Sequence, residues 1–198
     1  MTNELATMLI AAFALMGSPG PATLSSAAVG AAYGWRRGLR YSSGIMAGTA
    51  TVLLIIAAGT TGILLTIPAL RFAMIAAGSL YILYLAFKIA TAKPIAAGNE
   101  NAPAPGFLPA WMLAVVNPKA YAAIGSVYAG STLIAGNLLA DTIIKIATLC
   151  CVIVIVNLSW LVMGSTLSRY FQDPKASRIL NISFAVLLVL SVLMTLFI

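Results

Sequence analysis

The chain has 198 residues, of which 62% are hydrophobic and only 8% are charged, and its net charge is +7. Soluble domains carry about 25% charged residues, so this composition excludes a water-exposed globular domain and indicates a protein embedded in lipid. The positive charge is then explained by basic residues at cytoplasmic helix ends rather than by a nucleic-acid partner. The sequence has no histidine, the commonest metal ligand and general base, which weighs against a membrane enzyme.

Six apolar runs are each long enough to cross a bilayer, which takes about 20 mostly apolar residues. Segment 93–106, KPIAAGNENAPAPG, is rich in Pro, Gly and Asn and is interpreted as a linker between two halves of three spans. We therefore predict an all-α membrane protein with one transmembrane domain, built from a repeat of about residues 1–92 and another of about 107–198. The six runs are 5–32, 41–65, 69–92, 107–135, 138–164 and 177–198.

The charges of the connections predict the orientation in the membrane. If the N-terminus lies outside, the inner connections hold eight basic residues and the outer connections hold only Arg71. By the positive-inside rule both termini then face outwards. Because each half has an odd number of spans, the second half runs opposite to the first, as in an inverted repeat. The inner basic residues are Arg36, Arg37, Arg40, Lys88, Lys93, Arg169, Lys175 and Arg178, and Trp35 and Trp160 are expected in an aromatic belt at the same interface.

The first span is interrupted by the sequence GSPGPA, residues 17–22. Proline inside a helix costs about 3 kcal/mol or more, and glycine costs about 1 kcal/mol relative to alanine. The break leaves backbone N–H and C=O groups unpaired, and in lipid these groups must face protein or a water-filled cavity. A packing kink without a ligand is the alternative interpretation.

The second and third spans contain two further features. Gly44 and Gly48 form a GxxxG motif, which predicts close helix packing either within the chain or against a second subunit of a homodimer. Tyr81 lies near the middle of the third span, where its hydroxyl could line a cavity or its ring could pack in the core.

The fourth span is interrupted at Asn117-Pro118-Lys119. Pro19 and Pro118 both lie about 17–21 Å into their spans, near the middle of the bilayer. Paired breaks in two inverted halves are typical of a transporter site, where helix N-termini attract carboxylates and freed carbonyls attract ammonium groups. Lys119 could bind a substrate carboxylate or hold the halves together, with snorkelling to the interface as the alternative. The predicted substrate-binding residues are Gly17, Ser18, Pro19, Gly20, Pro21, Asn117, Pro118, Lys119 and Tyr81.

The first turn of the fifth span contains Asp141, the only acidic residue within an apolar run. It is a candidate for coupling transport to protons. A structural pair with Lys145, one helical turn later in the favoured order, is the alternative.

These motifs resemble those of the LysE/RhtB family of amino-acid exporters. The matching stretches are SPGPATL in the first span, GWRRGLR leading into GIMAG, GSLYILYLAFKI in the third span and NPKA in the fourth. The resemblance implies a bacterial plasma-membrane protein that exports amino acids or close derivatives in exchange for protons by alternating access. Thr49 stands where many members of the family have an acidic residue. Ala22 stands where the family often has asparagine after the second proline of the first motif. These departures favour neutral or small apolar amino acids over cationic ones.

Two other classes remain as alternatives: a small-solute or ion channel, and a structural membrane subunit. A channel would require rings of polar or charged residues along a pore. We expect no catalytic residue, no metal, no cofactor and no nucleic-acid partner. The expected partners are an amino-acid substrate, protons and the lipid bilayer.

Overall fold

The computed structural model describes residues 2–59, 68–91, 104–170 and 174–196, and this part of the chain is folded into eight α-helices. The predicted all-α fold is confirmed. Residues 60–65 of the second predicted span, most of the linker and Lys93 lie outside the described residues. The helices are α1 (Thr2–Gly17), α2 (Pro21–Tyr33), α3 (Trp35–Ala57), α5 (Pro68–Ala90), α6 (Phe107–Val115), α7 (Pro118–Ala129), α8 (Leu138–Tyr170) and α9 (Pro174–Leu196).

The outer surface of the helix bundle is strongly apolar. Phe72 and Leu138, for example, are 74% and 82% exposed, as is expected of side chains that face lipid rather than water. Among the described helices, α3 and Leu138–Leu167 of α8 are long and apolar enough to cross a membrane alone, and α1 and α2 together qualify as one bent span. The structure is thus that of a helical membrane protein, and the count of six spans stays a prediction.

Both helix breaks that the prolines predict are present. α1 ends at Gly17 and α2 begins at Pro21, with a bend of 63° between the two helices. α6 ends at Val115 and α7 begins at Pro118. In each case proline occupies the first helical turn, where its missing N–H breaks no helical hydrogen bond.

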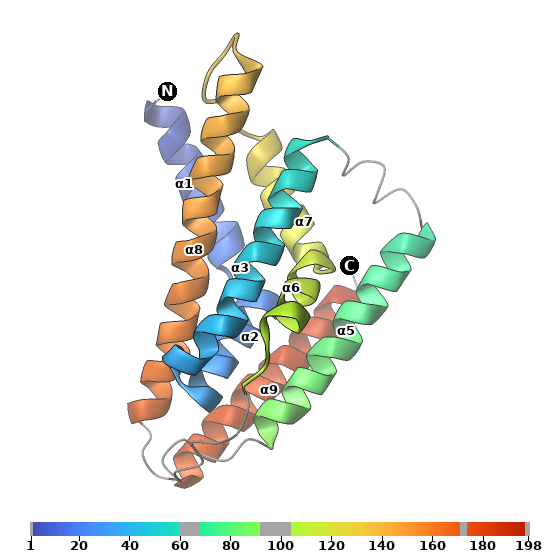
Figure 1. Cartoon of the computed structure of the whole chain (residues 1–198), viewed down its shortest axis with the longest axis vertical. Coiled ribbons are helices and arrows are strands. Elements are labelled where there is room, and N and C mark those ends of the chain that lie inside the picture. The colour runs from blue at the N-terminus through green and yellow to red at the C-terminus, as the bar shows by residue number, and fades with distance from the viewer. Residues whose placement is uncertain (1, 60–67, 92–103, 171–173, 197–198) are drawn as a thin grey trace.

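Basic residues gather at one end of the bundle, the lower end in Figure 1, where α2 and α5 end and α3 and α9 begin. We call this the basic end; its members with described side chains are Arg36, Arg37, Arg40, Lys88, Lys175 and Arg178, and Arg169 belongs to the last turn of α8. The first three belong to α3 rather than to a connection, because that helix begins at Trp35 and not at residue 41 as predicted. The starts of α1 and α8 lie at the opposite end (Figure 1).

Glycines allow the helices to touch through their backbones toward the basic end. A Cβ atom on Gly44 or Gly48 would overlap backbone carbonyls of α6, so this motif packs within the chain. A Cβ on Gly30 would overlap the carbonyl of Leu161 in α8, and one on Gly164 would overlap that of Ala27 in α2. These two glycine seams, α3 against α6 and α2 against α8, close the bundle on that side of the breaks.

Candidate substrate site at the two helix breaks

Lys119 joins the two helix breaks. Its Nζ atom donates hydrogen bonds to the carbonyl oxygen of Ser18 at 2.6 Å and to that of Pro19 at 2.9 Å. The C-terminal end of a helix carries partial negative charge on its unpaired carbonyls, so a lysine is stabilised there. Of the roles that the sequence left open, this contact matches the one in which Lys119 holds the two halves together.

Gly20 provides the space for this contact. A Cβ atom at position 20 would lie 2.6 Å from Cδ and 2.7 Å from Nζ of Lys119. The backbone of Gly20 is extended, with φ −173°, so any residue could adopt its conformation. A side chain here would require the end of the flexible Lys119 side chain to shift, because that side chain lies directly against the backbone of Gly20.

Other protein groups pair with most of the remaining backbone at the first break. The indole Nε1 of Trp160 in α8 donates to the carbonyl of Gly17 at 3.0 Å. The Thr23 hydroxyl accepts from the amide of Gly20 at 3.0 Å and lies within hydrogen-bond distance of the Ser18 carbonyl. The polar edge of Trp160, which was predicted to lie in an interfacial belt, is thus used at the break, and the belt stays a prediction.

The second break is organised by Asn117. Its side-chain oxygen accepts from the backbone amide of Lys119 at 3.1 Å, which makes it the N-cap of α7. Asparagine is a favoured N-cap and proline a favoured first residue. The order Asn-Pro-Lys thus begins a helix in which the third residue can extend its side chain toward the first break.

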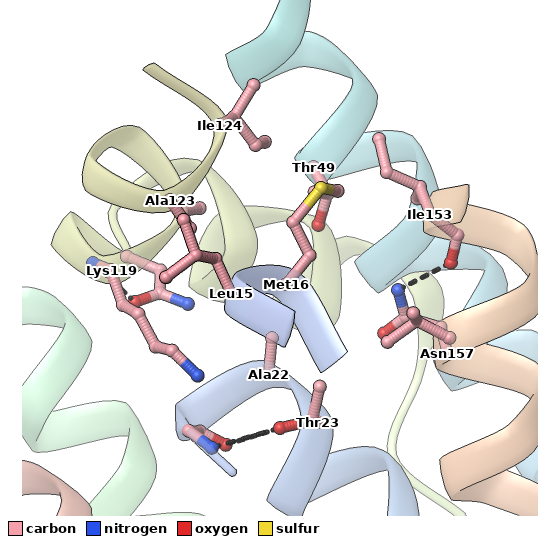
Figure 2. Close-up of a pocket in the computed structure, with 14 residues that line it drawn as sticks. Leu15, Met16, Ala22, Thr23, Thr49, Lys119, Ala123, Ile124, Ile153 and Asn157 are labelled. Carbon is pink, nitrogen blue, oxygen red and sulfur yellow. Dashed lines mark hydrogen bonds between the residues drawn. The ribbon is translucent and has the colours of Figure 1, made fainter. Parts of the chain in front are cut away.

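A cavity adjoins the breaks on the side away from the basic end. The space open to the centres of water-sized molecules is about 40 Å³, and about 10–15 Å³ by this measure holds one water. The cavity therefore has room for about three waters or a group of similar size, and Figure 2 shows the residues around it. Its walls are Leu15, Met16, Gly20, Ala22, Thr23, Thr49, Asn117, Lys119, Ala120, Ala123, Ile124, Ile153, Val156 and Asn157.

Charge is distributed unevenly in this cavity. Lys119 and the N-terminal end of α2, at Ala22 and Thr23, make one side positive. Thr49 and Asn157 contribute neutral oxygen atoms from α3 and α8. No carboxylate is among the described residues of the wall, so the cavity is suited to an anionic group at one side and to uncharged or apolar groups elsewhere.

The structure brings most of the predicted site residues together. Gly20, Asn117 and Lys119 line the cavity. Ser18 and Pro19 contact Lys119 through their carbonyls, and Gly17 contacts Trp160 in the same way. Pro21 and Pro118 begin α2 and α7. Tyr81 is not part of the cavity wall: it packs against the core cluster that contains Tyr41, and its ring lies 6.2 Å from that of Tyr84.

Asp141 lies apart from the cavity, in the first turn of α8. Its Oδ2 atom is 2.8 Å from Nζ of Lys145, and both side chains are less than 10% exposed. Its Oδ1 atom accepts from the amides of Leu133 and Ile134 at 2.6 and 3.0 Å. Nζ of Lys145 also lies 4.8 Å from the ring centroid of Tyr128. This geometry is that of a structural pair that fixes the loop before α8, and the coupling role stays a prediction.

Thr23, Trp160 and Asn157 belong to the site but were not singled out by the sequence as site residues. Thr23 and Trp160 act on backbone atoms, and their side chains carry no charge that would have drawn attention. Asn157 did give a signal, because an amide within a long apolar run must find a partner in lipid.

Comparison with known proteins identifies the family. The model of the LysE type translocator family matches residues 13–195. The chain is 32% identical over 176 residues to cysteine/O-acetylserine efflux proteins of Salmonella choleraesuis (strain SC-B67) and Salmonella typhimurium (strain LT2), with 87% of each chain covered. It is 31% identical over 175 residues to the protein of that name in Salmonella paratyphi A, again covering 87% of both chains. No solved structure matches at a significant level.

Proposed function

The chain belongs to the LysE type translocator family, and we propose on this premise that it exports small amino acids or close derivatives by proton antiport with alternating access. As a member it is a multi-pass transporter of the bacterial inner membrane and not an enzyme. The observation that carries the proposal is the contact of Lys119 with the carbonyls of Ser18 and Pro19 beside a small cavity.

This contact suggests how binding and movement are linked. A substrate carboxylate that enters the cavity would compete with the two carbonyls for the ammonium group of Lys119. Binding would then weaken the link between α7 and the first break. This link joins the broken span of one half to the broken span of the other. A ligand shifts a conformational equilibrium only through contacts that differ between the two states, and this exchange of partners is such a difference.

Buried polar groups on the side of the bundle toward the basic end support alternating access. Ser26, Ser42 and Asn181 are buried there without hydrogen-bond partners. Each is seven residues, or about 10 Å, from the end of its helix at Tyr33, Trp35 and Pro174 respectively. Buried unpaired polar groups cost free energy and require an explanation. A state open to the cytoplasm would hydrate these groups, which are buried in the described state.

The proposed topology has six spans in two inverted repeats, with both termini outside and the basic end in the cytoplasm. The basic residues at one end support this orientation. Because Gly44 and Gly48 pack against α6, they no longer argue for a second subunit, and a homodimer would need another interface.

Proton antiport is proposed with Asp141 as the candidate coupling residue. In the described state its carboxylate is shared between Lys145 and two backbone amides. A coupling role would require this pair to open during the transport cycle. The described part of the cavity wall has no carboxylate that could replace it.

The proposed substrates are amino acids with small, uncharged side chains. Three features support this class: the size of the cavity, the threonine at position 49 and the relatives named for efflux of cysteine and O-acetylserine. A cationic side chain would find no negative partner among the described wall residues.

The test is efflux from proteoliposomes loaded with labelled amino acids, measured with and without a pH gradient. We expect saturable flux of small neutral amino acids that a gradient accelerates, and slow flux of lysine. The proposal fails if no amino acid of a broad panel moves in a saturable manner. Steady ion conductance in planar bilayers would instead favour a channel.

A further inference from the structure

We propose that Asn157 binds the ammonium group of the substrate and thereby makes the site selective for zwitterions over acids that lack a free amine. The proposal rests on the export function proposed above. It adds a specificity-determining residue to that site, located on α8 rather than on either helix break.

The first observation is an unpaired acceptor on a residue of the cavity wall. Asn157 is only 5% exposed, and its Nδ2 donates to the backbone carbonyl of Ile153 at 2.8 Å. Its Oδ1 atom is buried and has no hydrogen-bond partner. Exchanging the nitrogen and the oxygen of the amide would place two acceptors against each other, so the oxygen is the free atom.

The second observation is the charge on the other side of the cavity. Figure 2 shows Lys119 and Asn157 on opposite sides, with Met16 and Ala22 between them. Lys119 and the N-terminus of α2 favour a carboxylate. An α-amino acid whose carboxylate lies there directs its ammonium group away from this positive side, toward the acceptors of α3 and α8.

Thr49 supplies a second acceptor on the cavity wall. Its hydroxyl donates to the carbonyl of Ile45 at 2.8 Å, so the lone pairs of its oxygen remain available to a donor. Two neutral oxygens can bind an ammonium group by hydrogen bonds without adding a negative charge. Such a subsite fits the ammonium of a zwitterion but gives no strong attraction for a second positive charge on a side chain.

Asn181 provides a matched control. It is also an asparagine in a long apolar helix, it is 1% exposed, and both of its side-chain polar atoms lack partners. It is not among the residues of the cavity wall. The two asparagines thus share chemistry and burial and differ in whether they face the cavity.

The experiment measures flux of labelled L-cysteine into or out of proteoliposomes under reducing conditions, with N-acetyl-L-cysteine as a competitor that lacks the ammonium group. Asn157→Leu keeps the volume of the side chain and removes the acceptor. We expect its KM for cysteine to rise about 10- to 100-fold, as for loss of a hydrogen bond to a charged group. The inhibition constant of N-acetylcysteine should not change, and Asn157→Asp, which keeps an acceptor, should retain the preference for cysteine.

The outcomes separate this assignment from the export function. If the wild-type protein moves no amino acid, the proposed function fails and the assignment fails with it. If the wild type prefers cysteine and Asn157→Leu keeps that preference, only the assignment of Asn157 is refuted. The same holds if Asn157→Leu weakens the binding of cysteine and of N-acetylcysteine by the same factor. Asn181→Leu should leave the preference intact. If Asn157→Leu does not reconstitute, Asn157→Ala is measured in its place.

Discussion

Replacing Gly20 with alanine tests the contact that joins the two breaks. The new Cβ would lie 2.6 Å from Cδ and 2.7 Å from Nζ of Lys119, so the end of this flexible side chain must shift. It would then lose its bonds to the carbonyls of Ser18 and Pro19. A hydrogen bond to a charged group is worth about 1.5–3 kcal/mol when buried. Because this group is partly exposed, we expect about 2–4 kcal/mol for the two bonds together.

A smaller effect opposes this loss. Alanine restricts the unfolded chain more than glycine does, which stabilises the folded state by about 0.4–1 kcal/mol where the conformation is compatible. The extended backbone of Gly20 is compatible with alanine. The net expectation is therefore a loss of about 1–3 kcal/mol in the free energy of unfolding, which comes from the displaced lysine rather than from backbone strain.

The assay is chemical or thermal unfolding of the purified protein in detergent, with Gly125→Ala as the control. Gly125 is in α7, and a Cβ there meets nothing within 4 Å. The effect of Gly20→Ala should be nearly absent in a Lys119→Ala background, because the displaced group is already gone. Equal destabilisation in both backgrounds, or none in the wild type, would refute the role assigned to Gly20. Lys119→Ala alone should abolish transport while insertion into the membrane remains normal.

Three other predictions follow from the packing and the buried polar groups. Gly164→Ala should destabilise the protein by more than about 3 kcal/mol, because its Cβ would overlap the backbone of Ala27. A stability equal to that of Gly125→Ala would show that α2 and α8 can move apart to accommodate the methyl group. Asp141→Asn should lower the free energy of unfolding, because the charge of Lys145 loses its carboxylate partner, and Lys145→Met in the same background should restore much of the lost stability. If flux in folded Asp141→Asn is still accelerated by a pH gradient, Asp141 is not the coupling residue. In a background with Cys150→Ala and Cys151→Ala, Ser42→Cys should be alkylated faster during transport than at rest, since Ser42 is fully buried in the described state; equal rates would contradict opening toward the basic end.

The parts of this fold that the sequence predicted are those that depend on local chemistry. Proline at positions 19, 21 and 118 cannot continue a helix, so the breaks could be located from the sequence alone. The partners of the broken ends could not be found in this way. The contact of Lys119 with Ser18 spans 101 residues, and the contact of Trp160 with Gly17 spans 143. Both depend on how α7 and α8 are placed against the first break, which is a matter of tertiary packing that the periodicity of the sequence does not reveal.

The contacts of the first break change the expected orientation of the substrate. The sequence suggested that freed carbonyls would attract the substrate's ammonium group. In the structure those carbonyls already accept from Trp160 and Lys119. The charge that remains to be balanced at the break is therefore positive, and it belongs to the lysine. A zwitterion is then expected to bind with its carboxylate toward the break, which leaves its ammonium group to the unpaired oxygen of Asn157.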